Sequence, residues 1–419
     1  MSINSIKIKS GINLHYLYTN KFKTTTLGIY IHRPLAKEEA TKNALLSMVL
    51  RRACPLYPDS RSLAKQLDEL YGATLETGVR KKGDSQIISM NLSFANEKFI
   101  NNAESILESV LSLADSMLLK QTLFSKEYVS QEKENLKTQI LSQINDKRQY
   151  ASLRCIEEMC KDEPSGIDRY GYINDIDNLD QNNLYEHYKN VFLTSPMDIF
   201  VCGEVDIFWV EQRLLEMFAG VEVKNSKYPK ISIIKDVKEV KNITETEQIA
   251  QGKLSMGFRT TVEASGAKYP ALLIYNAVLG SGAYSKLFNN VREKLSLAYY
   301  ASSNADFLKG ILMINSGIEV ANFQKAYDEI MLQMEAIKNG DITDEEMRSA
   351  ILGTINSIKS LTDNAVLMED YYLSKLIAGN IIGIDELARL ASSITKEQVI
   401  EVAKDIKLDT VYFLKGSEA

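Results

Sequence analysis

Residues 279–299 read LGSGAYSKLFNNVREKLSLAY, a glycine-containing turn followed by a charged helical stretch that leads into a strand. Further strands and a helix lie on either side of this stretch in the sequence. A strand at 253–259 and an apolar helix that includes Leu272 precede it, and two strands at 299–307 and 311–318 follow, joined by a turn that contains Gly310. Sheet and helix therefore alternate closely here, which predicts an α+β unit.

The same order of elements occurs in the first half of the chain. Leu254 precedes Leu272 by 18 residues, and Leu27 precedes Leu45 by 18 residues. A strand-turn-strand pattern at 74–80 and 86–94 matches the pair at 299–307 and 311–318, and the offset between halves drifts only from about 227 to about 218. We infer one unit of ~200 residues used twice.

This repeat predicts two homologous lobes, each a mostly antiparallel sheet with helices packed on one face. We expect an N-terminal lobe over 1–221, a lysine-rich linker over 222–251 and a C-terminal lobe over 252–419. A duplicated unit with a long connector favours a clam-shell arrangement with a cavity between the lobes.

Composition limits the chemistry. The chain has 419 residues, is 45% hydrophobic and 25% charged, and carries a net charge of −6, so a nucleic-acid partner is not expected. No run approaches the ~18 apolar residues of a transmembrane segment. Its four cysteines form no C-x-x-C pair and residues 1–19 do not resemble a signal peptide, which favours a cytoplasmic location.

Histidine is scarce. The three histidines, His15, His32 and His187, lie far apart, so no helix or loop can offer two imidazoles at the spacing of a local zinc motif. We interpret His32 and His187 as surface or capping residues. Glu132 is expected to pair along its helix or to face solvent. Taken alone, Gly280-Ser281-Gly282 is a helix-ending turn rather than a phosphate loop, and Arg292-Glu293-Lys294 is a solvated charge run.

Read as a whole, residues 279–299 resemble the C-terminal-domain signature of the pitrilysin/insulinase superfamily of zinc peptidases, which includes the mitochondrial processing peptidases. The duplicated layout agrees, so the resemblance covers nearly the whole chain. In that family an arginine and a tyrosine seven residues apart hold the substrate backbone and the oxyanion. The resemblance implies this substrate-binding role for Arg292 and Tyr299.

Active members of that family carry an inverted zinc motif, H-x-x-E-H, and a glutamate ligand on a later helix. At the matching positions this sequence has Asn43 and Ser47 in place of the histidines, Leu46 in place of the base and Gln139 in place of the later glutamate. None of these four side chains is an imidazole, thiolate or carboxylate. We therefore expect no catalytic residue, no metal and no cofactor in this chain.

Further motifs resemble a narrower branch, the non-catalytic YfmF/YmfF-type proteins of Gram-positive bacteria. Its members accompany a sister chain that keeps the zinc motif and are named for an association with the 5-aminopentanol modification of elongation factor P. The motifs are Lys21-Phe22-Lys23-Thr24, Ala44-Leu45-Leu46, Leu67–Ala73, Lys81-Lys82-Gly83, Asn145-Asp146-Lys147, Tyr150-Ala151 and Glu157–Pro164.

The resemblance implies a non-catalytic subunit of a heterodimeric zinc metallopeptidase. The zinc would be in the sister chain, and the substrate would be a peptide or an unfolded polypeptide. Two alternatives stay open. The chain could be a peptide-binding or scaffold protein of the same fold without proteolysis, or an enzyme with relocated ligands, which would require His15, His32 or His187 to converge with acidic residues.

Overall fold

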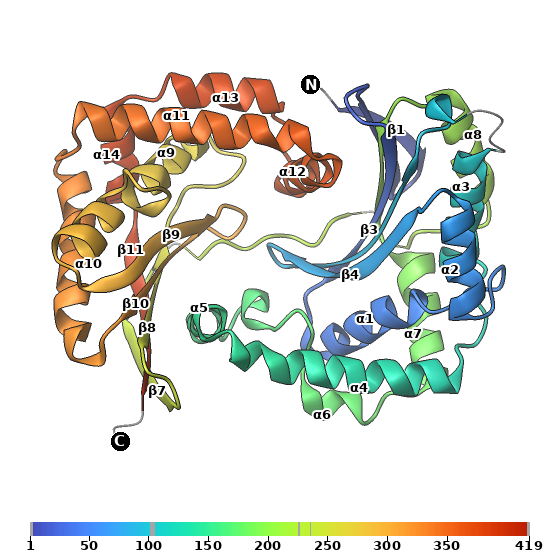
Figure 1. The fold of residues 1–419 in the computed structure, drawn as a ribbon, viewed down its shortest axis with the longest axis horizontal. Helices are drawn as coiled ribbons and strands as arrows, with labels where there is room; N and C mark the ends of the chain where they lie inside the picture. The colour runs from blue at the N-terminus through green and yellow to red at the C-terminus, as the bar shows by residue number, and fades with distance from the viewer. Residues whose placement is uncertain (1–2, 101–104, 225–226, 235, 417–419) are drawn as a thin grey trace. The chain divides into compact units, whose positions relative to one another are not determined.

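A computed structural model describes residues 3–100, 105–224, 227–234 and 236–416 (Figure 1). The chain packs into two compact units, each assembled from separate pieces of the sequence. Unit 1 comprises Met1–Leu141, Ile167–Lys230 and Thr362–Leu373, and unit 2 comprises Ser142–Gly166, Ile231–Leu361 and Ser374–Ala419. The predicted lobe boundaries, the linker and the clam-shell arrangement stay predictions. Residues 225, 226 and 235 of that linker lie outside the described residues.

Unit 1 is built on a six-stranded sheet in the order β1-β2-β6-β3-β5-β4, in which only the β2–β6 pair is parallel. The strands are β1 (Asn4–Lys9), β2 (Ile12–Tyr18), β3 (Thr24–Pro34), β4 (Thr74–Lys82), β5 (Ser85–Ala95) and β6 (Met197–Gly203). The helices are α1 (Lys37–Leu50), α2 (Ser60–Glu69), α3 (Ile106–Leu118), α4 (Lys126–Ser142), α6 (Ile173–Ile176), α7 (Gln181–Thr194) and α8 (Ile207–Met217), with a 3₁₀ turn η1 (Glu97–Phe99).

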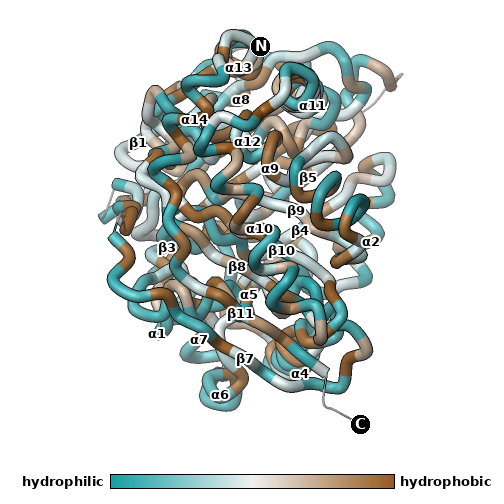
Figure 2. The backbone as a smooth tube through the Cα atoms, turned by 90° about the vertical axis from the view of Figure 1, so that its left-hand side faces the viewer, coloured by the Kyte–Doolittle hydropathy of each residue, from teal (hydrophilic) through white to brown (hydrophobic). Residues whose placement is uncertain are grey.

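Unit 2 is built on a five-stranded sheet in the order β7-β11-β8-β10-β9, with β7–β11 as its one parallel pair. The strands are β7 (Lys241–Glu247), β8 (Gly252–Arg259), β9 (Ala298–Asp306), β10 (Ile311–Ile318) and β11 (Lys407–Gly416). The helices are α5 (Lys147–Met159), α9 (Tyr269–Gly280), the π-helical η4 (Leu287–Lys294), α10 (Phe323–Lys338), α11 (Asp344–Ser360), α13 (Ile384–Ser392) and α14 (Lys396–Lys404). Helix α13 carries both hydrophilic and hydrophobic residues, as amphipathic packing requires (Figure 2), whereas α9 is almost entirely apolar and buried.

The two sheets confirm the predicted repeat. The order β2-β6-β3-β5-β4 in unit 1 matches β7-β11-β8-β10-β9 in unit 2, and the parallel pair occupies the same place in both. Local predictions also hold. Helix α9 ends at Gly280. Threonine at 343 with glutamate three residues later is the sequence signature of a capping box, and Thr343 forms this box with Glu346 at the start of α11. The sequence pattern of residues 97–119 predicts one helix, but the structure has a 3₁₀ turn and α3 there. Residues 101–104 between the two lie outside the described residues.

One helix in each unit comes from the other half of the sequence. Helix α5 packs on the unit 2 sheet, on the face opposite α9, and the first half of α12 (Ala365–Ala378) packs on the unit 1 sheet (Figure 1). These helices occupy equivalent places in the repeat, since their first residues are 365 − 147 = 218 positions apart. Helices therefore cover both faces of each sheet, beyond the single face that the pattern predicted.

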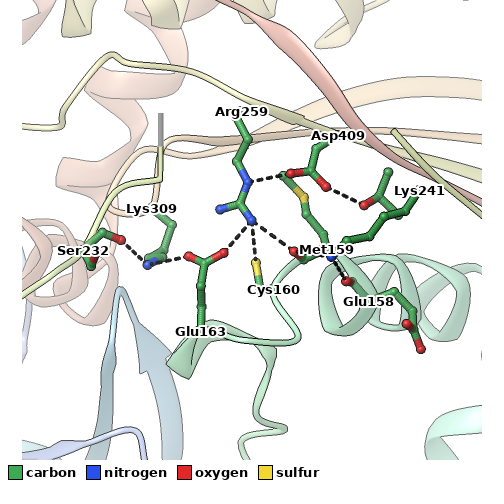
Figure 3. Close-up of polar contacts among 10 residues, drawn as sticks. Glu158, Met159, Cys160, Glu163, Ser232, Lys241, Arg259, Lys309 and Asp409 are labelled. Carbon is green, nitrogen blue, oxygen red and sulfur yellow. Dashed lines mark hydrogen bonds and ion pairs between the residues drawn. The ribbon is translucent and has the colours of Figure 1, made fainter. Parts of the chain in front are cut away.

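Buried charges hold the segment after α5 in unit 2 (Figure 3). Glu163 forms ion pairs with Arg259 of β8 and with Lys309, whose Nζ lies 3.3 Å from Glu163 Oε2. Arg259 also contacts Asp409 Oδ2 at 3.1 Å and donates to the Met159 carbonyl at 3.1 Å. Because the carboxylates of Glu163 and Asp409 lie among the cations, the charges in this buried cluster balance.

Candidate functional site

Arg292 and Tyr299 lie at the two ends of a tight connection within unit 2. Arg292 belongs to η4, and Tyr299 is the second residue of β9. The backbone N–H of Leu297 donates to the carbonyl of Val291 at 3.0 Å, which closes the connection. The π-helical turn was not predicted from the sequence, although such turns are frequent at functional sites.

Both side chains of this pair reach solvent. Tyr299 is 66% exposed, and its hydroxyl has no hydrogen-bond partner in the described part of the chain. The Arg292 side chain is 43% exposed; its guanidinium carbon lies 4.6 Å from the centre of the Phe288 ring, and its Nε lies 3.5 Å from Glu293. Chemically, a guanidinium and a phenol are hydrogen-bond donors that can hold a peptide carbonyl or a negative oxygen.

The positions that match the H-x-x-E-H zinc motif lie on α1, and their polar side chains are buried and already hydrogen-bonded. Asn43 is fully buried, donates through Nδ2 to Gln86 Oε1 at 2.7 Å and accepts from His187 Nε2 at 2.7 Å. Ser47 donates to the Ala44 carbonyl at 2.7 Å, one turn back in its own helix. The imidazole and the amides are thus bonded to one another, not left free for a ligand.

The other two positions add no ligand chemistry. Leu46 belongs to the hydrophobic core of unit 1, and Gln139 is a half-buried amide on α4. No group of three or more His, Cys, Asp or Glu side chains that could hold a metal ion occurs among the described residues. The residues that replace the motif do not fit a zinc ion, because an aliphatic chain, a hydroxyl and two neutral amides offer only weak ligands.

His187 is buried, which corrects the prediction of a surface or capping residue. Burial lowers its pKa to about 4, so the imidazole is neutral near pH 7. Its partner Asn43 lies 144 residues away in sequence, and spacing gives no signal for such a contact. Glu132 is also buried rather than exposed to solvent. Its Oε1 lies 3.3 Å from Arg52 Nε, and its Oε2 accepts from Asn135 Nδ2 at 3.1 Å, a pair along its own helix.

His15 and His32 converge on one acid, Asp198 of β6. Each imidazole Nε2 lies 2.8 Å from a different carboxylate oxygen, and the Tyr228 hydroxyl donates to the same carboxylate at 2.8 Å. Burial alone would raise the pKa of Asp198, but the hydrogen bonds from the histidines outweigh it and hold the pKa well below its usual range. His32 is therefore a buried partner of Asp198, not a surface residue.

A duplicated α+β fold with a donor pair on its second unit and replaced ligands on α1 defines a metallopeptidase-like protein. Residues 178–353 match the family described as "Peptidase M16 inactive domain". The chain is 35% identical to the "Probable inactive metalloprotease YmfF" of Bacillus subtilis strain 168, over 99% of both chains. It therefore belongs to the peptidase M16 family, as an inactive metalloprotease-like member.

More distant relatives agree. An "Uncharacterized zinc protease YmxG" of Bacillus subtilis is 23% identical over 54% of each chain. A crystal structure of a conserved protein from Enterococcus faecalis V583 superposes with a TM-score of 0.91 at 28% identity, covering 99% of both chains. A protease from Helicobacter pylori shares the fold at a TM-score of 0.81 and 15% identity, over 99% of both chains. No helix in the described ranges is both long and apolar enough to cross a membrane.

Proposed function

We propose that this chain is the non-catalytic subunit of a heterodimeric zinc metallopeptidase. A sister chain with an H-x-x-E-H motif would contribute the zinc ion and the general base, and this chain would contribute Arg292 and Tyr299. The contrast between the two positions supports the proposal best. Asn43 is locked into buried hydrogen bonds, whereas Arg292 and Tyr299 keep exposed donor groups.

In this role the two donors bind the peptide and do not perform a chemical step themselves. The Arg292 guanidinium and the Tyr299 hydroxyl would hydrogen-bond the carbonyl of the scissile peptide and stabilise the negative charge that develops on its oxygen. Stacking on Phe288 limits the freedom of the Arg292 guanidinium before a peptide arrives. A partly ordered donor loses less entropy on binding than a mobile one.

The test is peptide turnover by the purified pair of chains. We expect Arg292→Ala or Tyr299→Phe to lower kcat/KM by ~100-fold or more if either group stabilises the oxyanion, with pairing unchanged in size-exclusion chromatography. Arg348→Ala and Tyr71→Phe are matched controls, because both residues are exposed and neither belongs to η4 or β9.

Unchanged turnover in both variants would remove the role assigned to Arg292 and Tyr299. If no sister chain co-purifies with this chain from its own cells, while the chain alone still binds peptides, the result would favour the alternative of a peptide-binding or scaffold protein. Peptide cleavage by this chain alone, with one tightly bound zinc ion, would contradict both proposals.

The proposal also includes a location and a biological context. The four cysteines are free and buried, which supports a reducing compartment such as the cytoplasm. A link to the modification of elongation factor P is part of the same proposal and is supported by the resemblance to the YmfF-type branch alone.

A further inference from the structure

An open cavity of about 640 Å³ lies within unit 2, and one of its lining residues, Arg148, contacts Ser302 of β9. Two short segments line it: residues 145–148 at the start of α5, and residues 249–251, just before β8, together with Lys253 of β8. Its neighbour on β9 is Tyr300, because the cations of the cavity pack against that ring.

Two cations flank the Tyr300 ring. The guanidinium carbon of Arg148 lies 4.2 Å from the ring centre, and the Lys253 ammonium lies 5.8 Å from it. Arg148 also donates to Ser302 Oγ at 3.2 Å, which fixes the guanidinium along β9. Within the described residues, neither Arg148 nor Lys253 forms an ion pair with a carboxylate.

The acids near the cavity have other partners. Asp146 accepts from the backbone N–H groups of Arg148 and Gln149 and so caps α5. Glu247 lies 3.3 Å from Lys147 and pairs with it. Burial, and then the charge of Arg148, lower the pKa of Lys253, and the charge of Asp146 offsets only part of this shift.

We propose that this cavity binds a carboxylate group of a peptide, held between Arg148 and Lys253 on the Tyr300 platform. The guanidinium fork suits a carboxylate, and the ammonium group would add a second charge-assisted hydrogen bond. The carboxylate comes either from an acidic side chain or from the C-terminus of the peptide.

The inference rests on the proposed function in one respect, namely that a peptide reaches β9 at Tyr299. Tyr299 and Tyr300 are adjacent in the chain, so their Cα atoms are about 3.8 Å apart. The pairing of β9 with β10 is irregular at this point, since Tyr300 pairs with Gly317 and Ala298 pairs with Ile318. A peptide held by Arg292 and Tyr299 would therefore pass close to the cavity. The substrate class that follows is peptides with a carboxylate near the bound carbonyl.

The experiment measures binding of three fluorescent decapeptides to the full-length chain by anisotropy. One has an internal glutamate and an amidated C-terminus, one is neutral with a free C-terminus, and one is neutral and amidated. We expect one of the two carboxylate peptides to bind about tenfold tighter than the neutral amide, in line with charge-assisted hydrogen bonding. The peptide that binds more tightly than the neutral amide identifies the source of the carboxylate.

The preference should disappear in Arg148→Gln/Lys253→Gln and persist in the control Arg348→Gln, with folding checked by circular dichroism. Equal affinity for all three peptides in the native chain would overturn the proposal, as would an unchanged preference in the double variant. If the double variant is unfolded, loss of the preference in Arg148→Gln alone supports the site and its retention overturns it.

The carboxylate site and the proposed peptidase role can fail independently of each other. Arg292→Ala should weaken binding of all three peptides equally and leave the carboxylate preference in place. A chain that keeps this preference, but whose pair with a sister chain shows no turnover, would support the cavity and contradict the heterodimeric peptidase.

Discussion

At the scale of single residues, Asn43 shows how the metal position has become part of the core. Its amide joins Gln86 to His187 in a chain of buried hydrogen bonds. Gln86 also donates to the Ala40 carbonyl at 3.1 Å and to the Arg169 carbonyl at 2.7 Å. The amide at this position therefore stabilises unit 1 by satisfying polar groups that no water reaches.

We expect Asn43→Leu to destabilise unit 1. The leucine would leave the Gln86 and His187 groups without their partner, at a cost of about 1–3 kcal/mol for each orphaned group. Ser47→Ala is the matched control on the same helix. Within the described residues the Ser47 hydroxyl bonds the Ala44 carbonyl alone, and its loss should cost less than about 1 kcal/mol. Urea denaturation followed by circular dichroism measures both, and equal midpoints for Asn43→Leu and native protein would contradict this account.

At the scale of elements, α5 and its following turn depend on the buried charges around Glu163. In Glu163→Gln the cations Arg259 and Lys309 would lose a carboxylate that is buried with them. Breaking a buried ion pair by removing one partner costs about 3–5 kcal/mol, against at most about 1 kcal/mol for an exposed pair. We therefore expect α5 to open far more often from the unit 2 sheet.

Native-state hydrogen exchange of the α5 amides measures this opening. A cost of about 3 kcal/mol corresponds to exchange faster by about 100-fold. Glu335→Gln serves as the control, because Glu335 forms an exposed pair with Lys338 on α10. Protection of α5 that is the same in Glu163→Gln and in the control would show that the buried cluster does not hold this element.

The sequence predicts elements well where the signal is local. The strand-turn-strand at β9 and β10 and the end of α9 follow from residues within a few positions of each other, and both occur as expected. The placement of α5 on the unit 2 sheet could not be predicted. Its buried residues Ala151, Cys155 and Met159 recur every four positions, which marks an apolar stripe but not the sheet that the stripe covers.

In the candidate site, too, only the local features could be predicted from the sequence. The spacing along α1 was sufficient to place Asn43 and Ser47 on one helix, whereas the hydrogen bonds to Gln86 and His187 join segments far apart in sequence. The sequence also does not predict that a glycine lies beneath each of the two helices that come from the other half of the chain, α12 in unit 1 and α5 in unit 2. A side chain at Gly28 would meet Glu369 of α12, and one at Gly257 would meet Met159 of α5. Such close approaches appear only once the helices are in place.

At the scale of the whole molecule, two buried titratable groups give the stability opposite dependences on pH. Burial raises the pKa of Glu369 to about 7, against hydrogen bonds from Thr26 and Tyr30 that lower it. The Glu369 carboxyl therefore binds a proton more tightly in the folded state than in the unfolded state. Its contribution to the free energy of unfolding is full below about pH 4.5 and is lost as pH rises through 7. His187, with its pKa lowered to about 4, contributes fully above pH 6.5 and loses stability as pH falls through 4.

Between pH 4.5 and 6.5 the free energy of unfolding falls with pH through Glu369 and rises with pH through His187. Each of the two contributions changes by about 1.4 kcal/mol per pH unit. Relative to the native protein, Glu369→Gln should gain on the order of 3 kcal/mol in free energy of unfolding from pH 4.5 to 6.5, because it removes the contribution that falls. His187→Gln should lose a similar amount over the same range. Urea titrations at three pH values give both differences, in which groups common to the three proteins cancel. Differences that do not change with pH would show that Glu369 and His187 titrate as they do in the unfolded chain.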